Sequence, residues 1–140
     1  MTMLFSIEAY PFRISNKLLT MLGKEVIKSK VKLDSTESVT LCFKDETYSP
    51  EAGGFHPVEI RLIKAGDHWE VDYITDFCYV GSGYNAELVK ELDFDFSNDY
   101  GYHLYSGEHS LIKLAGLYQL WEGNFLSYVA MDVFTVTVHG

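Results

Sequence analysis

Covalent and metal cross-links are scarce in this sequence. Its 140 residues include two cysteines, Cys42 and Cys78, and no Cys-x-x-Cys pair. Each cysteine lies inside an apolar, strand-like run, which favours buried free thiols, although one disulfide between them also fits the count. A chain of this length buries about two-thirds of its unfolded surface, so it does not need such cross-links for stability. We therefore expect residues 1–140 to form a single domain.

Positive charge is also scarce, and this limits the classes of partner. Eleven Lys and Arg face twenty Asp and Glu, giving a formal net charge of -9. So acidic a chain repels phosphate backbones and anionic lipids, which argues against binding to nucleic acid or to a membrane. No apolar run is long enough to span a bilayer, and the N-terminus lacks the pattern of a secretory signal. The expectation is a cytoplasmic protein whose protein partner, if it has one, is basic.

Catalytic and cofactor motifs are missing as well. There is no Gly-x-Ser-x-Gly, no Gly-x-Gly-x-x-Gly and no Gly-Lys-Ser/Thr, which excludes the common nucleophile elbow and phosphate-binding loops. The five histidines form no His-x-x-x-His pair and lie far from both cysteines in sequence, so their spacing predicts no zinc site. We expect no cofactor and no metal, and favour a non-enzymatic role.

Alternating apolar and polar residues are the strongest pattern present. Aromatic residues make up 15% of the chain, which suits strands. The runs 58–64 and 69–73 alternate with period two, and the turn-like segment 65–68 between them predicts a hairpin. In its expected register Lys64 faces Trp69, Leu62 faces Val71 and Ile60 faces Tyr73. The same register places Arg61 opposite Asp72 on the other face.

Helical spacing occurs twice. Residues 15–28 predict a helix capped by Ser15 or Asn16, and residues 106–124 predict a second helix that ends at Gly123 and Asn124. The segment 86–96 is ambiguous: its first part fits two helical turns capped by Asn85, while alternation predicts a strand from Glu91 to Phe96. Further strands are predicted at 38–44, 100–105 and 129–138, while residues 74–80 either continue the second hairpin strand or bend into another.

These elements predict an α+β fold. It is an antiparallel sheet of about six or seven strands, with the N-terminal helix and the late helix packed on one face. The sheet must alternate apolar and polar residues because one of its faces meets solvent.

Two groups of residues are candidates for a binding site. The irregular segment 45–57 carries Tyr48, Phe55 and His56, and because it holds two aromatic residues we expect it to pack over the rest of the fold; its part 53–57 is the candidate binding loop. Asp93 and Asp95 point the same way on a strand, and Asp72 and Asp76 could lie near them. Paired carboxylates can bind a cation or share acid and base roles, but a solvated sheet face explains them more simply.

Several runs resemble an uncharacterised bacterial family, domain-of-unknown-function family 2787. They are GGFHPVEIR at 53–61, YITDF at 73–77 and KELDFDF at 90–96, followed by Leu120-Trp121 and Asn124-Phe125. The resemblance covers the chain from about Tyr48 to the C-terminus. Members of this family occur in marine gamma-proteobacteria, often on genomic islands.

The resemblance implies a fold and a type of role, but no catalytic residue, because the family has no assigned activity. Its fold is similar to that of the mitochondrial acidic matrix protein, or complement-receptor-like, family. Those proteins have a long antiparallel sheet flanked by helices and form acidic, ring-shaped trimers that bind other proteins. The present chain is shorter and ends on a strand-like segment. The resemblance thus implies a binding role and a homo-oligomer, either a trimer or a dimer.

Three hypotheses about function follow. The first is an interaction protein that binds a protein partner through an acidic or aromatic surface, as an accessory of a genomic island or in host interaction. The second is a small-ligand binder or hydrolase-like enzyme that uses the loop 53–57, with His56 beside a carboxylate such as Asp76 or Asp95. A deep pocket with that contact would favour the second over the first. The third is a structural subunit of a larger assembly.

Overall fold

The chain folds into one antiparallel sheet covered by two helices. The computed structural model describes residues 3–7 and 10–140. Its strands are β1 (Ser38–Lys44), β2 (Val58–Ala65), β3 (His68–Val80), β4 (Glu87–Asp95), β5 (Tyr100–His103), β6 (Gly107–Ser110) and β7 (Thr135–His139). Its helices are α1 (Asn16–Lys28) and α2 (Ala115–Ala130), with short 3-10 turns at Leu33–Ser35, Gly83–Asn85 and Leu111–Leu114.

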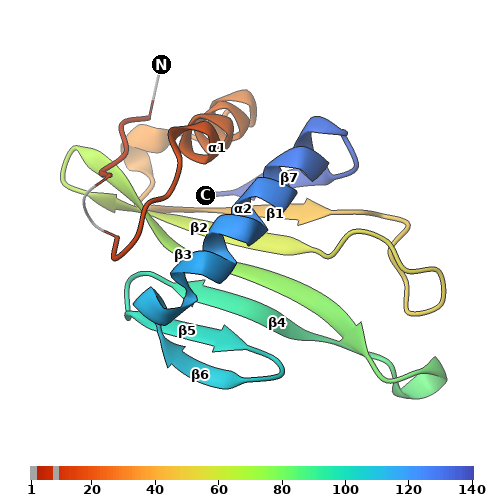
Figure 1. Cartoon of the computed structure of the whole chain (residues 1–140). Helices are drawn as coiled ribbons and strands as arrows, with labels where there is room; N and C mark the ends of the chain where they lie inside the picture. Colours follow the sequence, from red (N-terminus) through yellow and green to blue (C-terminus); the bar gives the residue numbers. More distant parts are fainter. Residues whose placement is uncertain (1–2, 8–9) are drawn as a thin grey trace.

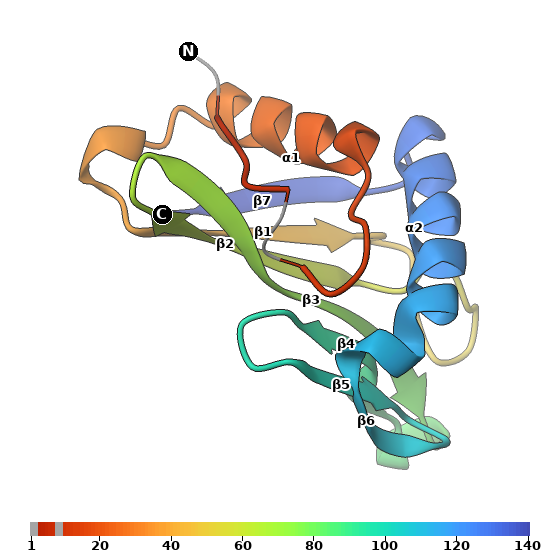
Figure 2. The same ribbon diagram turned by 60° about the vertical axis from the view of Figure 1, so that its left-hand side comes forward.

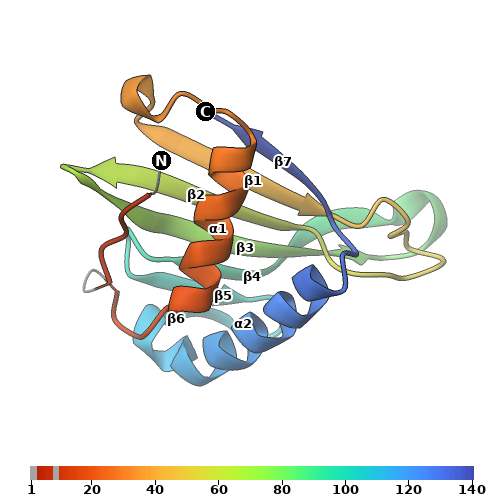
Figure 3. The ribbon, with the colours of Figure 1, turned by 90° about the horizontal axis from the view of Figure 1, so that it is seen from above.

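The sheet has the order β6-β5-β4-β3-β2-β1-β7, and every neighbouring pair is antiparallel. Both helices lie on the same face of this sheet (Figures 1 and 3). The predicted α+β class, strand number and helix placement are therefore confirmed. Among the described residues, no helix combines the length and apolar character that a membrane crossing requires.

Local sequence explains the elements that were predicted correctly. The Ser15 hydroxyl accepts a hydrogen bond from the Leu18 amide, so it caps α1 at the expected residue. Strand β1 spans the predicted residues, and its inner positions Val39, Leu41 and Phe43 are fully buried. Cys42 and Cys78 are both free, as their apolar surroundings favoured. The ambiguous segment 86–96 is a strand from Glu87 onwards.

The β2–β3 hairpin contains a bulge that its sequence did not predict. Lys64 pairs with Trp69 and Leu62 with Val71, as expected, but Ile60 pairs with Ile74 rather than Tyr73. The register shifts between Arg61 and Leu62, which leaves Asp72 as an extra residue on β3. An extra residue reverses the alternation beyond it. The core therefore receives Ile74, which is completely buried, instead of Tyr73.

The late helix begins and ends later than its sequence predicted. Residues 107–110 form β6, which pairs with β5, and α2 starts after a 3-10 turn, close to this small hairpin (Figure 2). The helix then continues through Gly123 and Asn124 to Ala130. Mid-helix glycine costs about 1 kcal/mol relative to alanine. Burial of Phe125, with 2% of its surface exposed, offsets that cost. The last strand is correspondingly shorter than predicted and pairs with β1 at the sheet edge.

An aromatic cluster joins α2 to the sheet. Tyr118 is 1% exposed, and its ring lies 5.1 Å from that of Phe94 on β4 and 4.8 Å from that of Phe12. Phe125 contacts Phe43 on β1 edge to face, with the centroids 5.0 Å apart. Edge-to-face pairs of this kind add about 0.5–1.5 kcal/mol beyond the area they bury. The cluster holds α2 against β4 and β1.

The packing predicts unequal effects for the same substitution at two isoleucines. Ile60→Ala removes a fully buried side chain, so we expect it to lower the free energy of unfolding by about 2–5 kcal/mol. Ile112→Ala removes a side chain that is 54% exposed and should change it by less than about 0.5 kcal/mol. Urea denaturation of both variants measures the difference. Equal losses would contradict the placement of β2.

Candidate functional site

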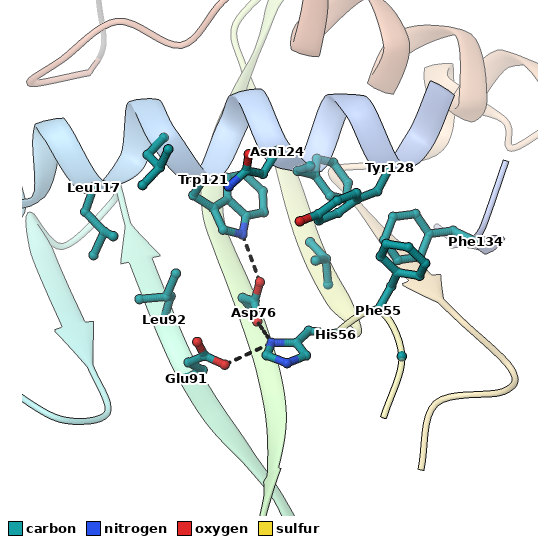
Figure 4. A pocket seen from close by; sticks show the side chains of 14 residues that line it. Phe55, His56, Asp76, Glu91, Leu92, Leu117, Trp121, Asn124, Tyr128 and Phe134 are labelled. Atoms are coloured by element: carbon teal, nitrogen blue, oxygen red, sulfur yellow. Dashed lines mark hydrogen bonds and ion pairs between the residues drawn. The ribbon is translucent and has the colours of Figure 1, made fainter. Parts of the chain in front are cut away.

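A cavity of about 370 Å³ lies between α2, strands β3 and β4, and the loop that leads into β2. One wall is aromatic, and Figure 4 shows it above a polar floor. The wall is formed by Phe55, Trp121, Phe125, Tyr128 and Phe134. The floor consists of His56, Asp76 and Glu91. These residues come from five separate segments of the chain, and the fold alone brings them together.

The two strand carboxylates reach the floor because of β-bulges. On β3 the bulge at Asp72 moves Asp76 onto the face that α2 covers. On β4 the register shifts so that Asp76 pairs with Leu92 and Phe77 with Lys90, which leaves Glu91 unpaired. In a regular strand Glu91 and Leu92 would point to opposite faces. Both line the cavity here, because the bulge turns Glu91 towards Asp76.

The loop that carries His56 is held by side chains of its own segment. The Phe55 amide donates a hydrogen bond to an oxygen of Asp45, at 2.9 Å. Gly54 has a φ of 136°, and a Cβ there would lie 2.7 Å from the same carboxylate, so this position requires glycine. The ring of Tyr48 lies 5.4 Å from the imidazole of His56. The loop is therefore an ordered support for the imidazole.

His56 contacts both carboxylates through one nitrogen. Its Nδ1 lies 3.1 Å from Asp76 Oδ1 and 2.9 Å from Glu91 Oε2. The hydrogen bond with Asp76 raises the pKa of His56, burial opposes this shift, and the negative charges of the two carboxylates add to it. The side chain is 38% exposed, so the imidazole can still be reached from the cavity.

Asp76 is a buried carboxylate with a partner for each oxygen. The residue is 8% exposed. Its Oδ1 faces His56, and its Oδ2 accepts a hydrogen bond of 2.9 Å from the indole Nε1 of Trp121. A buried carboxylate without such partners would cost several kcal/mol (order of magnitude). The Trp121 contact also fixes the orientation of the carboxylate plane.

A thiol lies next to this group. Burial raises the pKa of Cys78 to about 11, and the carboxylate of Glu91 adds to the shift. The sulfur therefore stays protonated near neutral pH and is a poor nucleophile. Chemically, the site offers an imidazole and two carboxylates beneath an aromatic wall.

The structure separates the six residues that the sequence nominated. Phe55, His56 and Asp76 line the cavity together. The other three lie away from it. Asp72 forms an ion pair of 2.5 Å with Arg61, although Arg61 pairs with Tyr73 and not, as predicted, with Asp72. Asp93 accepts a hydrogen bond from Thr75, and Asp95 accepts one from the Asn98 amide.

Sequence reasoning missed Glu91 and Trp121. Trp121 lies at helical spacing from other apolar residues, which indicates core packing. This pattern does not predict the hydrogen bond that its indole N–H donates to Asp76. In a regular strand Glu91 would point to the face opposite Leu92, away from the cavity. No residue type near Glu91 indicates the bulge that turns it. His56 beside Asp95 was also expected as an alternative, but Asp95 lies opposite Tyr73, outside the cavity.

The contacts of His56 predict a pH-dependent stability. Because its pKa in the folded state is raised above about 6.5, the stabilisation is complete below that pH and is lost as the pH rises through the raised value. With no metal ion added to either protein, we expect the His56→Gln variant to be less stable than the wild type in mild acid. The difference in free energy of unfolding should shrink towards alkaline pH. Urea unfolding between about pH 5 and 9 measures this.

The matched control for this prediction is His139→Gln, at the exposed end of β7, which should leave the difference flat across the same range. A gap between His56→Gln and the wild type that widened with rising pH would show that the sign is wrong.

Comparisons with known proteins identify a family and two similar solved structures. A model described as a protein of unknown function, DUF2787, matches residues 16–139. A solved structure of the hypothetical protein VC0508 from the Vibrio cholerae VSP-II pathogenicity island is 33% identical, with a TM-score of 0.87, and 98% of each chain is covered. No curated protein matches the sequence.

A second solved structure is that of the conserved hypothetical protein VC1805 from the Vibrio cholerae pathogenicity island VPI-2. It is 36% identical, with a TM-score of 0.82, and the match covers 93% of this chain and 97% of that one. It is described as sharing structural homology with the human P32 protein, which confirms the expected likeness to the mitochondrial acidic matrix protein. The chain belongs to the DUF2787 family.

Proposed function

We propose that this protein is a binding protein whose ligand occupies the cavity beneath α2. The ligand has an aromatic or apolar body, which lies against Phe55, Trp121 and Tyr128, and one polar end at His56, Asp76 and Glu91. A single observation carries the proposal: an aromatic-walled cavity ends in three titratable side chains that converge on one point. Apolar pockets with a few convergent polar groups are typical of ligand sites.

The size and order of the cavity support this role. Its volume of about 370 Å³ falls within the range of about 300–1,000 Å³ that small-molecule sites occupy. The wall is packed rather than loose. The ring of Phe55 lies 4.8 Å from that of Tyr128, and the rings of Trp121 and Phe125 stack at 4.9 Å. A preformed wall lowers the ordering cost of binding.

The contact between His56 and a carboxylate favours ligand binding over protein binding by a flat surface. Both side chains of that contact line the cavity, so a ligand inside the cavity can reach them. The source of the ligand is open to experiment. The same chemistry could come from a free small molecule or from a side chain that a partner inserts.

Filling the cavity should weaken the binding of small aromatic ligands. The probes are benzylamine, benzyl alcohol and benzoate, which share one aromatic body and differ in the charge of the polar end. We expect at least one of them to bind to the wild type, and Leu117→Trp, which fills the cavity, to weaken that binding by about tenfold or more. Saturation-transfer NMR with titration measures the affinities.

The control variant is Ile112→Trp, which adds the same indole at an exposed position outside the cavity and should bind the probes like the wild type. Failure of all three probes, or equal binding by Leu117→Trp, would sink the proposal.

A second candidate function is binding of a basic protein partner on the sheet face opposite the helices. Glu59 and Asp95 alternate with core residues and therefore point to that face, where both are partly exposed, and the net charge is -9. Asp93 lies on the same face but is buried against Thr75. The expectation of a dimer or trimer belongs to this candidate and stays a prediction.

Electrostatic binding of this kind should weaken with salt. We expect the affinity for poly-L-lysine to fall by about tenfold or more between low and physiological ionic strength, and a Glu59→Gln/Asp95→Asn double variant to bind less tightly. Fluorescence anisotropy measures both effects. Binding that ignores salt, or that is tighter for poly-L-glutamate, would contradict this candidate.

A further inference from the structure

We infer that the floor of the cavity is a binding site for a divalent transition-metal cation, with His56 Nδ1, one carboxylate oxygen of Asp76 and one of Glu91 as its ligands. This inference rests on the proposed function and deepens it, because it names the chemistry at the polar end of the same cavity. Residues 3–7 and 10–140 contain one such group of three potential ligands, whose donor atoms lie within 4.8 Å of one another.

The separations between the donor atoms fit a metal ion. Nδ1 of His56 lies 3.1 Å and 2.9 Å from the oxygens of Asp76 and Glu91. For metal–ligand bonds of about 2.1 Å, adjacent ligands are about 3.0 Å apart in an octahedral arrangement and about 3.4 Å apart in a tetrahedral one. The two carboxylate oxygens lie within 4.8 Å of each other, so an ion could contact all three atoms once the side chains adjust.

Neighbouring groups orient the ligands as they do in metal sites. The indole N–H of Trp121 holds Asp76 Oδ2, which leaves Oδ1 directed at His56. Hydrogen bonds to the outer oxygen of a ligating carboxylate are a regular feature of such sites. Glu91 is directed to the floor by a bulge that breaks the regular strand. Bulges of this type are over-represented beside functional sites.

Charge supplies a third argument. Two carboxylates meet at the floor, and Asp76 is 8% exposed. A divalent cation would balance both charges and leave the imidazole neutral, as metal ligation requires. Mixed imidazole and carboxylate ligands suit zinc, manganese and ferrous iron, whereas magnesium and calcium prefer oxygen alone. Three protein ligands leave coordination positions for water or for a ligand in the cavity.

A protonated His56 that bridges the two carboxylates would have the same distances. Only one of the two states contains a metal ion, so a measurement of metal binding distinguishes them. The probes are Zn²⁺ and Mn²⁺ alone, titrated calorimetrically into full-length protein that has been freed of metal with EDTA. We expect one site per chain for each ion. His56→Gln and Glu91→Gln should each weaken binding by about tenfold or more.

Matched controls are His109→Gln and Glu87→Gln, which change the same residue types outside the group and should bind like the wild type. Circular dichroism checks that every variant is folded. Because open coordination positions admit water, bound Mn²⁺ should also enhance water-proton relaxation in the wild type. Absence of binding at millimolar metal, or unchanged affinity in both His56→Gln and Glu91→Gln, would overturn the inference.

The aromatic probes, tested in EDTA, separate this inference from the proposed function. If they bind and neither ion does, the metal site is wrong and the binding role stands. If an ion binds and no probe does, with or without the ion, the metal site stands and the ligand-binding role falls.

Discussion

The buried carboxylate of Asp76 ties the structure together. It accepts a hydrogen bond from Trp121 on α2 and contacts His56 in the loop before β2, while its own strand lies in the middle of the sheet. An unpaired carboxylate at this depth would be costly, so helix, loop and strand must keep their relative positions. The same contact forms part of the cavity, because both Asp76 and Trp121 line it. Stability and the candidate site are thus consequences of one arrangement.

Two irregularities in the sheet make that arrangement possible. The extra residue at Asp72 reverses the facing of the second half of β3, and the bulge at Glu91 places two successive residues on one face of β4. Without the first, Asp76 would face away from α2. Without the second, Glu91 would point away from His56. The first bulge also gives the core Ile74 in place of Tyr73, and together the two bulges form the polar floor of the cavity.

Two of the similar proteins come from Vibrio cholerae pathogenicity islands, and both are described as hypothetical proteins. The similarity covers nearly the whole length of both chains, so the sheet and both helices are shared features of this fold. A cavity with aromatic walls and a charged floor is compatible with a binding role, and it lies on the helix-covered face. The opposite face keeps the alternation of polar residues, although Thr75 and Asp93 on it are buried.

Local pattern alone determined the sheet, the first helix and the pairing near the hairpin turn. Alternation and capping act over a few residues, so Ser15, the run 38–44 and the pair Leu62–Val71 could be placed correctly. The resemblance in the runs 53–61, 73–77 and 90–96 determined the family. These runs also contain all three residues of the polar floor, although the sequence nominated two of them.

Tertiary structure decided the rest, because the competing energies are not local. Gly123 and Asn124 are stop signals, but burial of Phe125, the next residue, against the sheet outweighs the propensity of these two residues. The bulges depend on which side chains the core accepts, as the exchange of Tyr73 for Ile74 demonstrates. His56, Asp76 and Glu91 come together only because both bulges and an ordered loop are present. No spacing of residues in the sequence predicts that combination.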